Sequence, residues 1–363
     1  MQNVHRLACA LTSMMLCSIV FCSIITAAPP AVEGVEYNRL FGPETPTGRY
    51  KHPASLTELA NGDLYLAWYG GDGEYAPGTA VYGSRFTAAS NKWAAPVKLA
   101  QDPFYSVGNP VVWQAPDGMV WLWYVVRPGT TWSTSRIAMK VSKDGAQTWS
   151  DASMLTFEEG TMVRGKPIVL MNGDYLLPVW KETGFDPEVV GADTVSYFLR
   201  YDPRAKKWSE STRIHSRLGA LQPAVVQVDE NYLIAYCRRG SGYGPRTDAY
   251  MIRAESHDGG KTWTEGIETK LPNPNAAVDF LKLRNGHLLL VYNDSMTKRT
   301  PLTVAISSDN DKTYAHRHDI ATGNFDYAYP YVIQTRDEKI HLVYTSHGRT
   351  VINHAVFEES AIK

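Results

Sequence analysis

The sequence predicts an all-β fold, a six-bladed β-propeller whose blades are four-stranded antiparallel sheets. A turn-and-strand unit recurs about every 55 residues, a second motif recurs with the same period, and no segment has the pattern of a long amphipathic helix. Dividing the chain beyond its N-terminal segment by this period gives six units. Four-stranded units that repeat six times, with an aromatic residue at a fixed place, are typical of a propeller.

The first repeat is a tight turn followed by an apolar strand. Asn-Gly and Asp-Gly pairs supply the positive φ angles that hairpin turns require. Runs rich in β-branched and aromatic residues follow each turn, for example at 64–70 and 120–126. The six copies of the turn begin at Asn61, Asp117, Asn172, Asp229, Asn285 and Asp337.

The second repeat is a Ser-x-Asp-x-Gly-x-Thr-Trp box, complete at 256–263 and nearly complete at 142–149 and 307–314. Its Asp can accept hydrogen bonds from turn amides, its Gly permits the turn, and its aromatic residue can pack between neighbouring sheets. We therefore expect the boxes to be structural. With the degenerate copies included, the closing aromatic residues are Trp93, Trp149, Trp208, Trp263 and Tyr314.

The N-terminus reads as an export signal. Residues 1–28 combine a positive start at Arg6, an apolar middle and a small-residue end before Pro29. A membrane anchor is the alternative, because the apolar stretch is nearly long enough to span a bilayer. We expect a secreted or periplasmic protein with no stable membrane span after cleavage. Three of the four cysteines lie in this segment, which leaves Cys237 without a disulfide partner.

Residues 29–363 are predicted to form one propeller domain, because the sequence contains neither a low-complexity linker nor a segment that indicates a second domain. A propeller closes by pairing its chain ends, so the strand at 351–357 should complete a blade begun near residues 36–50.

The 36 basic and 37 acidic residues give a net charge of −1, which argues against a nucleic-acid partner. Histidine and cysteine spacing indicates neither a metal nor another cofactor.

A proline marks the expected start of five inner strands, where no ladder donor is needed. The residue before each proline should lie at the mouth of the central channel. Polar groups that converge there would form a concave binding site. The residues at or beside these positions are Lys51, His52, Asn109, Arg164, Lys166, Gln222, Asp279 and Tyr329.

Charged residues at the ends of the second strands can join this ring. Arginines bind carboxylates bidentately, and a carboxyl group against an apolar wall can act as a general acid. The candidates are the arginines Arg238, Arg299 and Arg349 and, in a Gly-rich loop of the first blade, Asp72 and Glu74.

The motifs at 52–55, 164–167, 222–224, 293–295 and 329–330, in this order, together with the Asp boxes, resemble the sialidase superfamily of BNR or Asp-box propellers. The nearest likeness is to its BNR-repeat-like branch of predicted exo-sialidases, over about residues 45–360. The resemblance implies three arginines for a substrate carboxylate, a tyrosine nucleophile paired with a glutamate, and an aspartate acid/base.

Carried over position by position, Arg238 and Arg299 match the second and third arginines, and Tyr329 matches the nucleophile. Lys51 stands where the first arginine is expected, and Gln222 stands where the glutamate is expected.

The aspartate position has no clear match. Gly78 stands near it, which leaves Glu74 or Asp72 as substitutes. His52 is not part of the sialidase set but fits the BNR-like branch.

These residues predict a sialidase-like glycoside hydrolase that acts on an acidic sugar, of sialic or uronic type, in a glycan. Tyr329, Glu74, Asp72 and His52 are the catalytic candidates. A uronate lyase, with His52 and Tyr329 as base and acid, and a non-catalytic glycan-binding propeller are the alternatives. The residues expected to bind substrate are Lys51, Arg164, Lys166, Gln222, Arg238, Asp279, Arg299 and Arg349.

Overall fold

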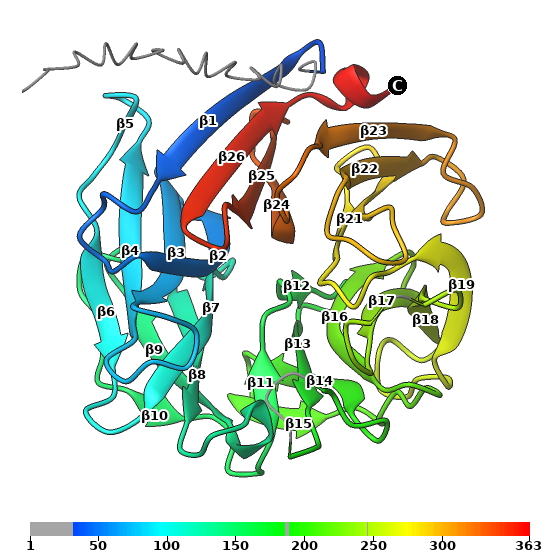
Figure 1. Cartoon of the computed structure of the whole chain (residues 1–363), viewed down its shortest axis with the longest axis horizontal. Coiled ribbons are helices and arrows are strands. Elements are labelled where there is room, and N and C mark those ends of the chain that lie inside the picture. The colour runs from blue at the N-terminus through cyan, green and yellow to red at the C-terminus, as the bar shows by residue number, and fades with distance from the viewer. Residues whose placement is uncertain (1–31, 186–188, 245) are drawn as a thin grey trace, which may run out of the picture.

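A computed structural model describes residues 32–185, 189–244 and 246–363, and the segment predicted as a signal peptide lies outside them. Six antiparallel sheets stand around a central axis, which confirms the six-bladed propeller (Figure 1). Within the described ranges, no helix has the length and apolar character needed to cross a membrane.

Each blade is built outward from an inner strand. Blade 1 contains β2 (Tyr50–Glu58), β3 (Leu64–Gly71), β4 (Ala80–Thr87), β5 (Lys92–Trp93) and β6 (Val97–Gln101). Blade 2 contains β7 (Ser106–Gln114), β8 (Val120–Arg127), β9 (Arg136–Ser142) and β10 (Ser153–Met154). Blade 3 contains β11 (Thr161–Val163), β12 (Ile168–Val169), β13 (Tyr175–Lys181), β14 (Val195–Asp202) and β15 (Lys207–Glu210).

The remaining blades follow the same plan. Blade 4 contains β16 (Ala220–Gln227), β17 (Leu233–Arg239), β18 (Tyr250–Ser256) and β19 (Ile267–Pro272). Blade 5 contains β20 (Asp279–Lys282), β21 (Leu288–Asn293), β22 (Leu302–Ser307) and β23 (His316–Ala321). Blade 6 contains β24 (Ala328–Gln334), β25 (Ile340–Ser346), β26 (Val351–Phe357) and β1 (Val35–Phe41).

Blade 6 closes the ring with strands from both ends of the described chain. The predicted pairing is found: β26 lies antiparallel to β1, with Val35 opposite Phe357. The N-terminal strand is the outermost strand of this blade rather than its first. A short 3₁₀ helix, η2 (Glu359–Ile362), follows β26 and buries Ile362 completely.

The sequence predicted that a proline begins each of five inner strands. Pro167 does directly precede β12, but the other four prolines lie inside their strands at bulges. The ladder register shifts around Pro53, Pro110, Pro223 and Pro330. A bulge leaves its residues outside the ladder, so a proline there needs no donor, and it can redirect a neighbouring side chain. The residues before three of these prolines have positive φ angles: Asn109 (46°), Gln222 (52°) and Tyr329 (55°).

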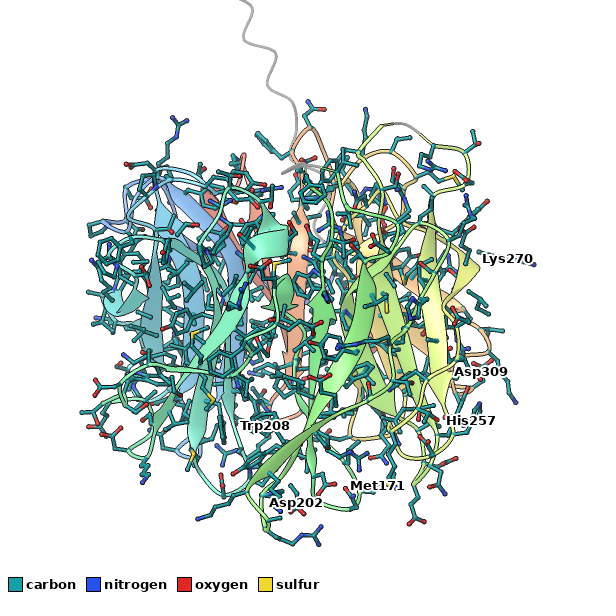
Figure 2. The ribbon with its side chains drawn as sticks, turned by 90° about the horizontal axis from the view of Figure 1, so that it is seen from below. Met171, Asp202, Trp208, His257, Lys270 and Asp309 are labelled. Atoms are coloured by element: carbon teal, nitrogen blue, oxygen red, sulfur yellow. The ribbon has the colours of Figure 1, made fainter. Side chains whose placement is uncertain are left out.

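The Asp boxes and the Asn-Gly turns lie at the end of the ring that is lower in Figure 2, where Met171, Asp202, His257 and Asp309 are labelled. In the complete box, the Asp258 carboxylate accepts hydrogen bonds from the Thr262 amide (2.9 Å), the Thr262 hydroxyl (2.6 Å) and the Ser256 hydroxyl (2.9 Å). These bonds have the structural role that was expected for the motif.

The aromatic residue that closes a box packs on the preceding blade. Trp263 of blade 4 stacks on Phe198 of blade 3, with 4.4 Å between ring centroids. Trp149 of blade 2 meets Tyr65 of blade 1 at 6.2 Å. The box therefore fastens its turn to the preceding sheet in the ring.

Asp258→Asn should lower the free energy of unfolding by about 1–2 kcal/mol, because the amide keeps one acceptor oxygen and loses the other. Burial raises the pKa of Asp258, but its hydrogen bonds outweigh burial and hold the pKa at about 2. The carboxylate's contribution is therefore complete above its ordinary pKa of 3.8 and is lost as the pH falls through about 2.

Urea unfolding at pH 7 and at pH 2 measures this difference. Asp151→Asn is the control, because Asp151 is exposed and no hydrogen bond to its carboxylate is recorded in the described chain. Equal losses of stability in the two variants at pH 7 would contradict the prediction.

Candidate active site

A small polar pocket opens at the channel mouth opposite the Asp boxes. It lies where the second strands of the blades end and the inner strands begin, because antiparallel strands bring these points to one face. Its free volume of about 30 Å³ is close to that of one water molecule. Blades 1, 2, 3, 4 and 6 contribute to its wall, including Glu74, Asn109, Trp132, Glu182, Gln222, Arg238, Tyr243, Tyr329 and Arg349.

Tyr329 lies at the centre of this pocket and is 7% exposed. Its phenol oxygen accepts a hydrogen bond from Arg238 Nη1 (3.0 Å) and another from Gln222 Nε2 (3.3 Å). The His52 ring packs edge-on against the Tyr329 ring, with 4.1 Å between centroids. Burial raises the pKa of the Tyr329 phenol, but the charges of Arg238, Arg299 and Arg349 outweigh burial, and the net shift is downward.

Arg238 uses donors on all three of its nitrogens. Besides Tyr329, it donates to Asn275 Oδ1 (2.6 Å), Gln222 Oε1 (3.1 Å) and the Tyr243 hydroxyl (2.8 Å). Burial lowers the pKa of this guanidinium, but the neighbouring Tyr243, Tyr329 and Glu182 outweigh burial and raise it overall. Arg238 is therefore a permanent, fixed positive charge beside the phenol.

Arg299 and Arg349 complete a group of three arginines. The Arg299 guanidinium lies 5.6 Å from the Tyr329 ring centroid and 5.4 Å from that of Tyr243, and it donates to the Asn275 carbonyl (3.0 Å). Arg349 forms an ion pair with Glu74 and donates to the Tyr50 hydroxyl (3.2 Å). Arg349 thus occupies the neighbourhood in which the sequence led us to expect Lys51.

Lys51 points elsewhere. Its ammonium donates to the backbone carbonyls of Gly48 (2.5 Å) and Thr45 (3.4 Å), and it is not among the residues that line the pocket. Neighbouring strand residues face opposite sides, so Lys51 and His52 cannot both face the channel while the strand stays regular. Asp72 is exposed and also lies outside the pocket wall, whereas Glu74 forms part of it.

His52 is buried at 1% exposure beneath Tyr329. The Thr345 hydroxyl donates to the Ala328 carbonyl (3.2 Å), so it accepts the hydrogen of His52 Nδ1 (2.7 Å). His52 Nε2 then carries no hydrogen and has no hydrogen-bond partner in the described structure. Burial, together with the surrounding arginines, lowers the pKa of His52 well below its usual value.

Three of the predicted binding residues brace the channel instead of lining the pocket. Arg164 and Lys166 lie between β11 and β12, where blade 3 lacks a continuous inner strand. Lys166 Nζ pairs with both carboxylate oxygens of Asp279 in blade 5 (3.2 Å each). Arg164 donates to the Val278 carbonyl (3.3 Å) and to the Pro330 carbonyl of blade 6.

Glu182 is a site residue that the sequence reasoning missed. Its carboxylate lines the pocket and accepts a hydrogen bond from Trp180 Nε1 (3.0 Å). Burial raises the pKa of Glu182 despite the lowering effects of Trp180 and Arg238. Its signal in the sequence is a charged residue at the end of a second strand, because Glu182 directly follows β13.

Arg238 and Arg349 line the pocket together with the carboxylates of Glu74 and Glu182, and the charge of Arg299 also acts on Tyr329, so the site suits an anionic ligand. Tyr329 is a candidate nucleophile, and Glu182 is a candidate proton donor because its pKa is raised. Across the described ranges, no group of three or more His, Cys, Asp and Glu side chains is placed to hold a metal ion.

Lys166→Met should lower the free energy of unfolding by about 3–5 kcal/mol, because it leaves the buried Asp279 carboxylate without its counter-charge. Chemical denaturation at pH 7 measures the loss. Lys181→Met is the matched control, since it breaks an exposed ion pair with Glu158 and should cost at most about 1 kcal/mol. If the two variants unfold alike, the cross-channel pair does not brace the ring.

Comparisons with known proteins agree with this architecture. The family model of the BNR repeat-like domain matches residues 62–342. The Hadza microbial sialidase Hz136 is 15% identical with a TM-score of 0.70, covering 86% of this chain and 66% of its own. A protein of unknown function from Dyadobacter fermentans is 18% identical with a TM-score of 0.74, covering 90% of this chain and 100% of its own.

The NanB sialidase from Streptococcus pneumoniae is 11% identical with a TM-score of 0.73, covering 90% of this chain and 71% of its own. Identities this low show a shared fold and no more. The chain spans about two thirds of the length of Hz136. No curated protein matches it in sequence.

The family model covers most of the chain, and the solved structures share its sialidase-like propeller, which confirms the resemblance seen in the sequence motifs. The chain belongs to the BNR repeat-like domain family.

Proposed function

We propose that the protein is a glycoside hydrolase that removes an acidic sugar from a glycan. The observation that carries the proposal is the group around Tyr329, where a buried phenol with a lowered pKa lies among Arg238, Arg299 and Arg349. An acidic sugar carries a carboxylate close to its reacting carbon, and arginines bind carboxylates with two parallel hydrogen bonds. The signal-like segment at 1–28 supports action outside the cytoplasm, on secreted or surface glycans.

Tyr243 occupies the place proposed for the substrate carboxylate. The Tyr243 hydroxyl accepts the hydrogen bond from Arg238 Nη2, and its ring lies beside Arg299. A substrate carboxylate can replace this hydroxyl as the acceptor once Tyr243 moves outward. Because Tyr243 is 42% exposed, it has solvent on one side into which it can move.

The chemistry follows the two-step route of a retaining glycosidase. The Tyr329 oxygen, in its phenolate form, attacks the anomeric carbon while the bond from that carbon to the glycosidic oxygen breaks, and the departing oxygen takes a proton from Glu182. Water then attacks the anomeric carbon, loses a proton to the Glu182 carboxylate, and releases Tyr329. The burial that raises the pKa of Glu182 favours the protonated form that the first step needs.

Glu74 and Asp72, the acids expected from the sequence, are less suited to this step. Glu74 forms an ion pair with Arg349 and accepts a hydrogen bond from the Tyr50 hydroxyl, so its carboxylate holds Arg349 in place. Asp72 lies outside the pocket wall. His52 lies behind Tyr329 and is almost fully buried, so the lyase alternative lacks an accessible base.

Glycan binding without cleavage remains a second candidate. Gln222 favours it, because a glutamine cannot take the tyrosine proton as the family's glutamate would. The two functions differ in outcome: a binder retains an acidic oligosaccharide unchanged during long incubation with excess protein, whereas a hydrolase consumes it.

Purified protein should be incubated with sialylated and uronate-terminated oligosaccharides and the products weighed by mass spectrometry. Hydrolysis adds the mass of water to the products, and elimination does not.

We expect Tyr329→Phe and Glu182→Gln each to lower kcat by about 10²–10⁴-fold. Arg299→Ala should weaken substrate binding through loss of a carboxylate ligand.

Asp72→Asn is the matched control for Glu182→Gln and should leave the rate unchanged, because Asp72 lies outside the pocket. Cleavage at the wild-type rate by both Tyr329→Phe and Glu182→Gln would refute the site assignment. The absence of cleavage, with acidic oligosaccharides bound and unaltered, would replace the hydrolase by the binder.

A further inference from the structure

The orientation of the Gln222 amide is fixed by its neighbour. A guanidinium can only donate hydrogen bonds, so the Gln222 atom that meets Arg238 Nη1 at 3.1 Å must be the carbonyl oxygen. The NH₂ group of the same amide therefore faces the Tyr329 oxygen at 3.3 Å. Gln222 presents a donor to the phenol, where the family's glutamate would present an acceptor.

The Tyr329 oxygen is consequently surrounded by donors. It accepts from Arg238 and from Gln222, and no acceptor for its own hydrogen is recorded among the described residues. A neutral buried phenol normally donates its hydrogen to a partner. A phenolate has no hydrogen to donate and accepts both bonds, so the observed partners suit the ionised form.

The charges that face Tyr329 come from every blade that packs on it. Arg164 and Arg299 lie 5.4 Å and 5.6 Å from its ring centroid, Arg238 donates to its oxygen, and the charge of Arg349 also acts on it. The opposing carboxylates are Glu74, which is paired with Arg349, and Glu182, which lines the same pocket. The His52 imidazole is kept neutral by burial and by these same arginines, since both lower its pKa.

We propose that Tyr329 rests as a phenolate in the free protein and that Gln222 is the positioning residue that keeps it ionised. A glutamate at this place would add a second negative charge beside the phenolate and give the proton an acceptor, and both effects favour the neutral phenol. With glutamine the nucleophile is formed before substrate arrives, and no base is needed. This catalytic meaning rests on the proposed function, whereas the ionisation is measured without substrate.

Ultraviolet absorbance at 295 nm detects tyrosinate and tests the proposal. Near pH 8, where free tyrosine with a pKa of about 10 is neutral, the wild-type protein should carry one equivalent of tyrosinate that is missing in Tyr329→Phe. Tyr50, Tyr69 and Tyr331 do not interfere, because burial holds their pKa values well above the usual 10.

Gln222→Glu should move this titration upward by about one pH unit or more. Gln227→Glu is the control, since Gln227 lies in the same strand, β16, and bonds to Met171 and Glu230 instead. Near-ultraviolet circular dichroism should be native for each variant that is compared. Gln222→Leu removes the donor without adding charge and should also raise the titration midpoint if the first variant fails to fold.

Identical wild-type and Tyr329→Phe spectra from pH 6 to 9 would overturn the phenolate. A titration unchanged in folded Gln222→Glu or Gln222→Leu would overturn the role of Gln222 and leave the arginines responsible. A phenolate present in a protein that cleaves no acidic oligosaccharide would instead refute the proposed hydrolase and leave this inference standing.

Discussion

Two buried cations from one blade hold the centre of this ring together. Arg164 and Lys166 replace the middle of the inner strand in blade 3 and reach across the channel to blades 5 and 6. Burying a charge costs several kcal/mol unless it is paired, and Asp279 supplies the pairing for Lys166. Gly165 between them allows this close approach, because a Cβ there would lie 2.4 Å from the Pro223 carbonyl. The channel is therefore filled by a polar brace.

One residue of the brace, Arg164, also contacts the candidate active site. Arg164 supports the Tyr329 ring from the channel side, and the Pro330 carbonyl that it binds belongs to the next residue of the chain. Tyr329 is thus held from below by a cation and at its oxygen by Arg238 and Gln222. In the proposed mechanism, a tyrosine held on both sides loses little freedom when substrate binds, which is the preorganisation that catalysis requires.

The repeat made the fold predictable, because period, turn chemistry and box aromatics are local features of the sequence. The direction in which each side chain points at the channel was harder to predict from the sequence. Lys51 and His52 are adjacent, and only the bulge at Pro53 decides which of them faces inward. Glu182 was not among the charged residues predicted at the ends of the second strands, although the end of β13 reaches the same pocket. Arg164 and Lys166 look like ligand-binding residues in sequence, and the break in blade 3 that turns them into braces depends on contacts with distant blades.

Ring closure has a consequence for how the chain is made. β1 pairs with β26, so the first described strand leaves the ribosome long before its partner exists. Most of its side chains, in the sequence VEYNRLF, remain exposed even after pairing. An unpaired strand of this polar composition resists association with other chains, which is the hazard of an exposed sheet edge. β1 is therefore suited to remain unpaired during synthesis until β26 has been made.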